Sequence, residues 1–300
     1  MLAAMMTSSW NGVRSCCLGL ALVSLLTVPA YAQSRTLSYD DYYRIRDVGS
    51  TAISPDGSTV AYVQSQVDEA ENRSRSALFL VATDGRGEPR RLTAEGDEES
   101  SPRWSPDGRL LLFDRRSSVE GRSGTWLLPT GGGEPFRLEG LEGDPVFDPT
   151  NRWIAFTREV PPEGEPPSGP DLTEEERKIV ERFDGRSYDW MQFRFDRRGY
   201  LPDPTDPFAT PPSQIFLLPR EGGSPRQLTG LDVDASDIAW HPDGTALVFV
   251  ADEHQRDEHT YSRADLWTVD LEGRVTRLTD DAFDWGDPTW APGGDRIVAR

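Results

Sequence analysis

Few residues in this chain combine the types and the spacing that covalent catalysis requires. A hydrolase serine needs Gly-x-Ser-x-Gly at a strand-to-helix turn. Ser123 and Ser187 come nearest: each has the glycine two residues before it but lacks the glycine two residues after it. The histidines, His241, His254 and His259, lie in a predicted turn and a predicted loop, away from any nucleophile. We therefore expect no catalytic residue and no cofactor in this chain, and no activity from it alone.

Residues 252–259 combine carboxylates with the imidazoles of His254 and His259, and both are groups that bind metals. The spacing of these two histidines matches no helical ligand pair, and most charged loops are only solvated. The sequence therefore predicts a solvated loop here and no metal site.

A stretch rich in aromatics, arginines and acids provides candidates for contacting a peptide. Aromatics and arginine are over-represented at binding hot spots, and carboxylates at a helix start could bind a free amino terminus. The structural alternative is a local core of aromatics with arginines paired to nearby acids, and an acidic first turn that stabilises the helix without a ligand. The candidate substrate-gating residues are Glu174, Glu175, Tyr188, Trp190, Arg194 and Tyr200.

The composition limits the partners of the chain. Its 300 residues hold 51 Asp and Glu against 32 Lys and Arg, a formal charge of −19. Nucleic acid binding needs clustered basic residues, so it is excluded. With 36% hydrophobic residues the chain is typical of a soluble globular protein.

Residues 1–32 have the pattern of a secretory signal. Arg14 provides the positive charge, residues 16–28 form an apolar run, and Ala30-Tyr31-Ala32 gives a cleavage site after Ala32. The run is too short to span a bilayer core of about 30 Å, so a retained anchor is the weaker alternative. Both cysteines, Cys16 and Cys17, lie inside this segment. We expect a periplasmic or secreted, cysteine-free chain without a membrane span.

The chain from residue 33 onward is a repeat array. An apolar residue followed by x-Pro-Asp-Gly, or a close variant, predicts a type I turn between two strands. A second pattern, an apolar strand, a glycine turn and a strand that commonly ends in Leu-Thr, predicts a hairpin. Each repeat therefore holds four short strands, the content of one propeller blade. The turns are at residues 52–57, 103–108, 146–151, 239–244 and 289–294, and the hairpins at 78–93, 126–138, 215–229 and 266–279.

The spacing of the turns predicts an all-β propeller of four full blades and half of a fifth. The prolines lie 43 to 51 residues apart, except for 93 between Pro149 and Pro242. This gap predicts an insertion at about residues 160–213 in the third blade, with a helix that begins after Thr173 and is capped by Glu176. Because the fifth blade has no hairpin, residues 33–300 are expected to be an incomplete propeller with further sequence downstream.

The turns of the type Trp104-Ser105-Pro106-Asp107-Gly108 and the Arg-x-Leu-Thr hairpins resemble the TolB-like propeller repeat. That repeat occurs in periplasmic scaffolds and in the N-terminal domain of prolyl oligopeptidase family serine peptidases. The insertion, through residues 172–176, 193–201 and 214–217, is similar to the acylaminoacyl-peptidase and dipeptidyl-aminopeptidase branch of that family, as is segment 39–43. The resemblance covers residues 36–300.

The resemblance implies a seven- or eight-bladed propeller over an α/β-hydrolase domain that follows it and carries a Ser-Asp-His triad. The propeller would restrict access to short or unfolded peptides. Asp189-Trp190 is followed by no adjacent glutamates, which favours an acylaminoacyl-type or general oligopeptide exopeptidase over strict dipeptidyl specificity. The alternative is a TolB-like periplasmic protein-binding scaffold without enzymatic activity.

Overall fold

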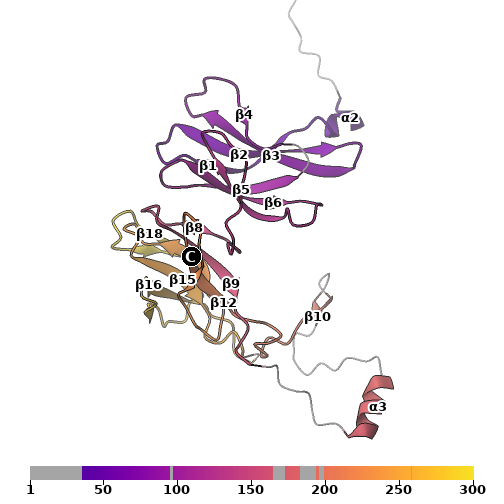
Figure 1. Cartoon of the computed structure of the whole chain (residues 1–300), viewed down its shortest axis with the longest axis vertical. Coiled ribbons are helices and arrows are strands. Elements are labelled where there is room, and N and C mark those ends of the chain that lie inside the picture. The colour runs from indigo at the N-terminus through magenta and orange to yellow at the C-terminus, as the bar shows by residue number, and fades with distance from the viewer. Residues whose placement is uncertain (1–35, 95–96, 165–172, 183–193, 196–198, 258) are drawn as a thin grey trace, which may run out of the picture. The chain divides into compact units, whose positions relative to one another are not determined.

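The computed structural model describes residues 36–94, 97–164, 173–182, 194–195, 199–257 and 259–300 (Figure 1). The chain divides into two units, residues 1–44 and 45–300. In the first unit, helix α2 (Tyr39–Tyr42) begins with a capping box in which the Ser38 N–H donates to Asp41 Oδ2 at 2.8 Å. The predicted signal, residues 1–32, lies outside the described residues.

The second unit is a series of antiparallel sheets, each made of strands in chain order, which confirms the predicted all-β propeller fold. Blade 1 contains β1 (Asp47–Ile53), β2 (Thr59–Asp68), β3 (Arg73–Ala82) and β4 (Arg90–Arg91). Blade 2 contains β5 (Glu98–Trp104), β6 (Leu110–Arg116) and β7 (Gly124–Pro129). Blade 3 contains β8 (Val146–Phe147), β9 (Trp153–Glu159), β12 (Ser213–Pro219) and β13 (Arg226–Gln227). Blade 4 contains β14 (Ser236–Trp240), β15 (Ala246–Ala251), β16 (Asp265–Asp270) and β17 (Val275–Arg277). The half blade contains β18 (Thr289–Trp290) and β19 (Ile297–Val298).

Blade 2 departs from the predicted four strands. Its fourth position is a single bridge between Leu127 and Phe136, and the described chain continues without a strand. In blades 1, 3 and 4 the hydroxyl of a threonine accepts an N–H of the third strand at 2.9–3.0 Å: Thr93 from Leu78, Thr229 from Ile215 and Thr279 from Leu266. In blade 2 Glu139 stands in place of this threonine, so that hydrogen bond is missing.

The repeated Pro-Asp-Gly turns have the predicted geometry. The N–H of the last turn residue donates to the carbonyl three residues earlier, for example Gly108 to Ser105 at 2.8 Å. Gly108 has φ 69°, and Asn151, which replaces glycine in blade 3, has φ 61°. Glycine adopts this left-handed region without steric cost and asparagine is among the residues that tolerate it, so both residues fit the same turn.

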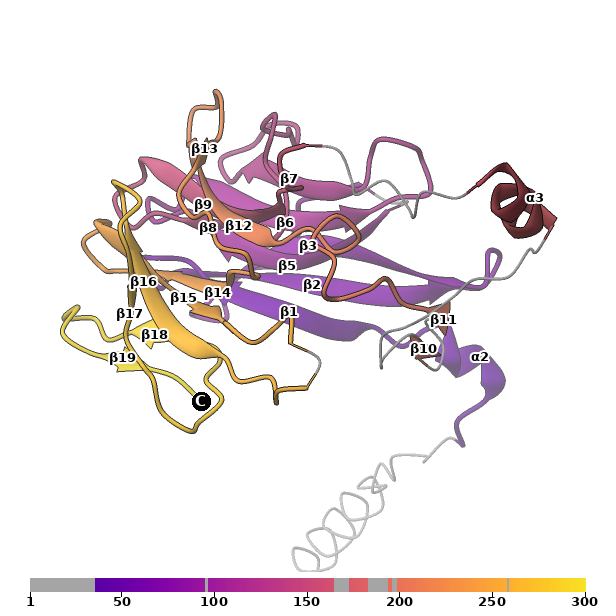
Figure 2. The same cartoon turned by 90° about the horizontal axis from the view of Figure 1, so that it is seen from below.

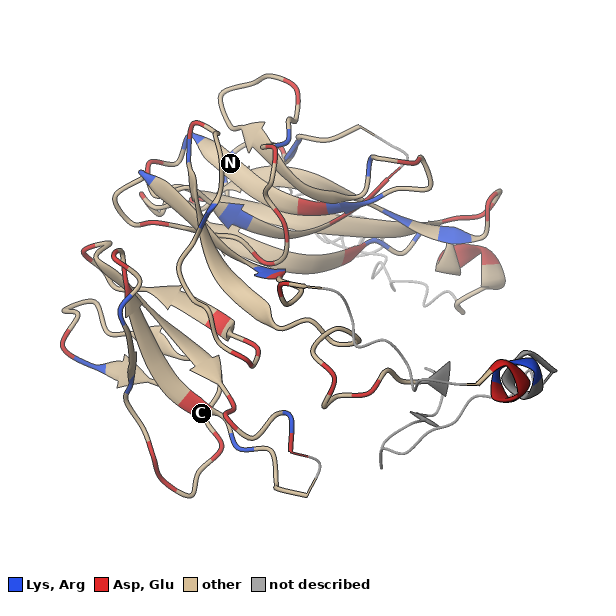
Figure 3. Ribbon diagram, turned by 60° about the horizontal axis from the view of Figure 1, so that its bottom comes forward, with Lys and Arg blue, Asp and Glu red and all other residues tan. Residues whose placement is uncertain are grey.

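Hydrophobic cores lie between successive blades. The second strands are buried on both faces rather than alternating, as in Leu111–Phe113, because each sheet packs against its neighbours. One cluster joins blades 1 and 2, one joins blades 2 and 3, and one joins blades 3 and 4. Figure 2 shows β3 of blade 1 beside β5 of blade 2, which is in contact with it. Charged residues gather in the turns and loops (Figure 3).

The tryptophan of the repeat links neighbouring blades. The indole N–H of Trp104 donates to the Ala52 carbonyl of blade 1 at 2.9 Å, and that of Trp240 donates to the Val146 carbonyl of blade 3 at 3.2 Å. Blade 3 has Phe147 at this position and cannot make the bond. There Arg103 of blade 2 donates to the Pro145 carbonyl at 3.2 Å instead.

Candidate functional site

The connections between the second and third strands form one end of each blade, which we call the loop end. The Pro-Asp-Gly turns and the glycine hairpins form the other, the turn end. Because the strands alternate in direction, the first strand also begins at the loop end. The loop ends of blades 1 and 2 meet where Ser76 Oγ donates to the Glu99 carbonyl at 2.7 Å.

The insertion of blade 3 emerges at the loop end. Strands β9 and β12 pair directly along their lengths, from Glu159 with Ser213 to Trp153 with Pro219. The Val160 N–H donates to the Pro212 carbonyl at 3.0 Å and closes the base of the insertion. Residues 160–212 therefore leave and rejoin the blade at one point.

Helix α3 (Glu174–Arg182) carries two of the candidate residues. Its predicted capping box is confirmed: the hydroxyl and the N–H of Thr173 donate to Glu176 Oε2 at 2.6 and 2.9 Å, and these two bonds lower the pKa of Glu176. Glu174 is exposed and lies 3.5 Å from Lys178 Nζ, and Glu175 is exposed. Both carboxylates lie in the first turn, where the helix dipole favours a negative charge.

A short hairpin carries two more candidates. Strands β10 (Arg194–Phe195) and β11 (Gly199–Tyr200) are antiparallel, with Arg194 opposite Tyr200. The structure thus brings the backbones of these two residues together. Tyr188 and Trp190 lie outside the described residues.

The return leg of the insertion, residues 201–212, is fixed by a residue that sequence reasoning did not single out. Arg256, in the loop of blade 4, donates from Nη1 to the Pro204 carbonyl at 3.0 Å and from Nη2 to the Thr210 carbonyl at 3.1 Å. The signal available in the sequence was an arginine within an otherwise acidic loop, which a solvated-loop interpretation did not explain.

The blade 4 loop shows no metal centre in the residues that the structure describes. The two carboxylate oxygens of Asp252 accept the N–H groups of His254 and Arg263, at 2.8 and 3.0 Å. Asp257 accepts the His259 N–H at 2.9 Å. These acids order the backbone of the loop.

A buried ion pair lies at the loop end of blade 2. Glu99 and Arg115 are cross-strand partners, and Arg115 donates from Nη2 and Nε to Glu99 Oε1 at 2.9 and 3.1 Å. The guanidinium also lies 4.6 Å from the ring centre of Trp126. Glu99 Oε2 is buried without a hydrogen-bond partner in the described part of the chain, and burial raises the pKa of Glu99. Sequence reasoning missed this pair.

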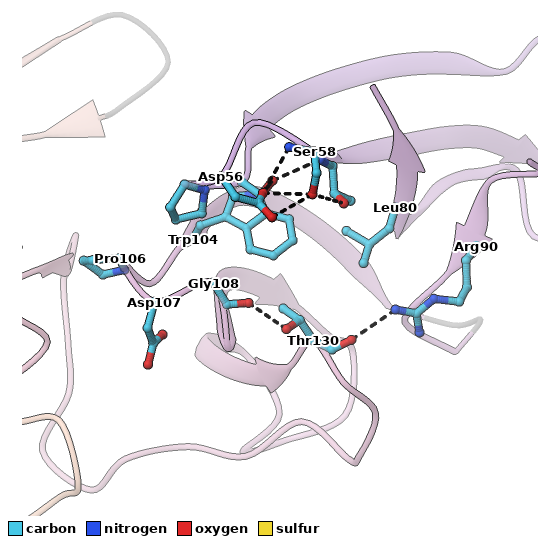
Figure 4. A pocket seen from close by; sticks show the side chains of 12 residues that line it. Asp56, Ser58, Leu80, Arg90, Trp104, Pro106, Asp107, Gly108 and Thr130 are labelled. Atoms are coloured by element: carbon cyan, nitrogen blue, oxygen red, sulfur yellow. Dashed lines mark hydrogen bonds between the residues drawn. The ribbon is translucent and has the colours of Figure 1, made fainter. Parts of the chain in front are cut away.

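A pocket of about 580 Å³ lies at the turn end between blades 1 and 2 (Figure 4). Asp56 on its wall accepts the hydroxyl of Ser54 at 2.6 Å and the N–H of Ser58 at 3.0 Å, and these bonds lower its pKa to about 2. Arg90 donates to the Thr130 carbonyl at 3.1 Å. The polar groups of this pocket serve the turns and present no catalytic pair.

Of the described helices, none is long and apolar enough to cross a membrane.

Comparison with protein-family profiles finds no match. Two curated proteins match the sequence. The uncharacterized peptidase YuxL of Bacillus subtilis is 28% identical over 230 residues, which is 75% of this chain and 32% of that protein. Dipeptidyl-peptidase 5 of Porphyromonas endodontalis is 24% identical over 300 residues, 92% of this chain and 41% of that protein. The chain thus spans about a third to two fifths of the length of these relatives.

Solved structures show the same fold. The acylaminoacyl peptidase of Pyrococcus horikoshii superposes with a TM-score of 0.56 and 16% identity, over 88% of this chain and 37% of that one. An oligogalacturonate lyase in complex with manganese has a TM-score of 0.52 and 13% identity, over 83% of this chain and 60% of that one. The resemblance predicted from the repeats and the insertion is confirmed, because both curated relatives are named as peptidases.

Proposed function

We propose, from the similarity of this chain to the propeller portion of prolyl oligopeptidase family peptidases, that it is the non-catalytic, substrate-gating part of an exported serine peptidase. The reaction is the hydrolysis of short peptides, of the acylaminoacyl-peptidase or dipeptidyl-aminopeptidase kind. The chemistry resides in an α/β-hydrolase domain that follows this chain in the same protein.

The observation that carries this proposal is the identity of the curated relatives. A propeller fold alone does not decide the function, because the lyase shares it. Both sequence relatives are named as peptidases, and each is much longer than the matched region. A fold match to a peptidase that extends over 88% of this chain agrees with them.

The gating role rests on where the insertion leaves the blade. It emerges at the loop end and carries exposed carboxylates at Glu174 and Glu175, together with Arg194 and Tyr200. Carboxylates attract the ammonium group of a peptide terminus, and an arginine and a tyrosine bind peptide carbonyls and side chains. Such groups select short peptides before they reach a distant serine.

Export rests on the signal pattern of residues 1–32. Cleavage after Ala32 leaves a chain without cysteine, which folds without disulfides in an oxidising compartment.

The test compares the 33–300 chain with the complete gene product. The 33–300 chain should hydrolyse no peptide p-nitroanilide and should take no fluorophosphonate label. The complete product should do both, and a Gly-x-Ser-x-Gly serine replaced by alanine is its control. Labelling of the short chain, or a complete product without peptidase activity and without such a serine, would overturn the proposal.

A further inference from the structure

The side chain of Arg256 joins two segments that are distant in sequence. Besides its bonds to the carbonyls of Pro204 and Thr210, Nη1 lies 3.3 Å from Thr210 Oγ1. Its Nε donates to the carbonyl of Asp232, in the connection between blades 3 and 4. One guanidinium therefore holds the return leg of the insertion against the start of blade 4.

The acceptors are neutral. Within the described residues Arg256 forms no ion pair with a carboxylate, and all its bonds go to carbonyl oxygens and a hydroxyl. A rigid planar fork of five N–H groups can satisfy several such acceptors at fixed positions, whereas a lysine ammonium cannot. The arrangement therefore depends on the shape of arginine rather than on its charge.

The loop that presents Arg256 is itself held in place. The Asp234 N–H donates to Gln255 Oε1 at 2.7 Å, and Gln255 Nε2 donates back to Asp234 Oδ2 at 2.5 Å. Asp234 Oδ1 also accepts the N–H of Ser213, the first residue of β12, at 2.7 Å. Gln255 and Arg256 thus bind both ends of the segment that runs from the return leg into blade 4.

The return leg is ordered on its own side of the contact. Asp203 Oδ1 accepts the Thr205 N–H at 2.8 Å, Asp206 Oδ1 accepts the Phe208 N–H at 2.9 Å, and the Asp206 carbonyl accepts the Thr210 N–H at 2.9 Å. This compact turn starts within a few residues of strand β11, which ends at Tyr200.

We infer that Arg256 is a positioning residue: it fixes the return leg, and with it strand β11 and Tyr200, at the loop end of blade 4. The consequence for peptide selection rests on the proposed function. Loss of the contact should leave the chemistry intact and alter how tightly longer peptides bind.

The first arm of the test measures amide hydrogen exchange in the whole 300-residue chain. In Arg256→Ala, exchange at the amides of Thr205, Phe208 and Thr210 should rise about tenfold or more, since several bonds to a charged donor are lost. Arg256→Lys should give nearly the same rise. Arg274→Lys, at the turn end of the same blade, is the matched control, and the amides of β15 should be unchanged in all variants. Unchanged exchange at the return leg in both Arg256 variants would overturn the inference.

The second arm uses the complete gene product and a series of peptides of increasing length. KM for the longer peptides should change severalfold in Arg256→Lys, while kcat for the shortest peptide stays the same. An equal change in kcat for every peptide would contradict the positioning role. If the wild-type product hydrolyses nothing, the proposed function fails, and the exchange arm still decides the position of the return leg.

Discussion

At the scale of single residues, Glu99 and Arg115 form an ion pair whose side chains are only 1% and 7% exposed. The raised pKa of Glu99 means that the folded state holds its proton more tightly than the unfolded state, whose carboxyl has the ordinary value of 4.5. The contribution of this group to stability is therefore fully present below 4.5 and is lost as the pH rises through the raised pKa.

This sign leads to a prediction for Glu99→Gln. The variant has no carboxyl to titrate at this position, so it should lose part of the fall in unfolding free energy that the wild type shows as the pH rises above 4.5. Urea unfolding across this range measures the slope. Glu98→Gln, on the same strand and paired with the exposed Arg116, is the control and should keep the wild-type slope.

Replacement of Arg115 should affect stability differently from replacement of Glu99. Arg115→Met leaves a buried carboxylate without its charge partner and should cost about 3 kcal/mol of unfolding free energy at neutral pH. Adding Glu99→Gln should recover most of this loss. If Arg115→Met alone were as stable as the wild type, the two side chains would not form a buried ion pair.

At the scale of elements, the threonine at the end of the hairpin motif links the end of the fourth strand to the third strand by a hydrogen bond. Thr229 is 2% exposed, and its hydroxyl accepts the Ile215 N–H at 2.9 Å. Ile215 is fully buried, so this N–H has no access to water.

Thr229→Val keeps the shape of the side chain and removes the acceptor. It should lower the free energy of unfolding by about 1–3 kcal/mol, because a buried donor is left unpaired. Thr276→Val, at an exposed position of β17, is the control and should be nearly neutral. Equal stability of the two variants in urea would contradict the role given to this hydroxyl.

The same motif shows what the sequence could and could not predict. Turns such as 103–108 and hairpins such as 215–229 repeat with fixed local chemistry, so the blades and the insertion in the third blade followed from short-range rules. The reduced fourth strand of blade 2 did not: the structure has a single bridge between Leu127 and Phe136 there, in the one hairpin where Glu139 replaces the threonine of the repeat. The contacts of Glu99 and Arg256 join residues of different strands or loops, and no spacing rule predicts them.

At the scale of the whole molecule, the exposed acids of α3 are the clearest test of substrate selection. In the complete gene product, Glu174→Gln with Glu175→Gln should raise KM for peptides with a free amino terminus about two- to fivefold, the size of an exposed ion pair. Peptides with a blocked terminus should be unaffected. Glu134→Gln, exposed in the turn-end hairpin of blade 2, is the control. An equal change for free and blocked peptides would argue against binding of the terminus.

The shared cores have a consequence for how the chain unfolds. Each cluster belongs to two blades, so its free energy is a nearest-neighbour term and not the property of one sheet. Among the described residues, blades 2 and 3 each take part in two such terms, whereas blades 1 and 4 take part in one each. Loss of blade 2 or blade 3 therefore removes half of two cores at once, and unfolding that starts in either should spread to its neighbours one boundary at a time, as in a one-dimensional lattice.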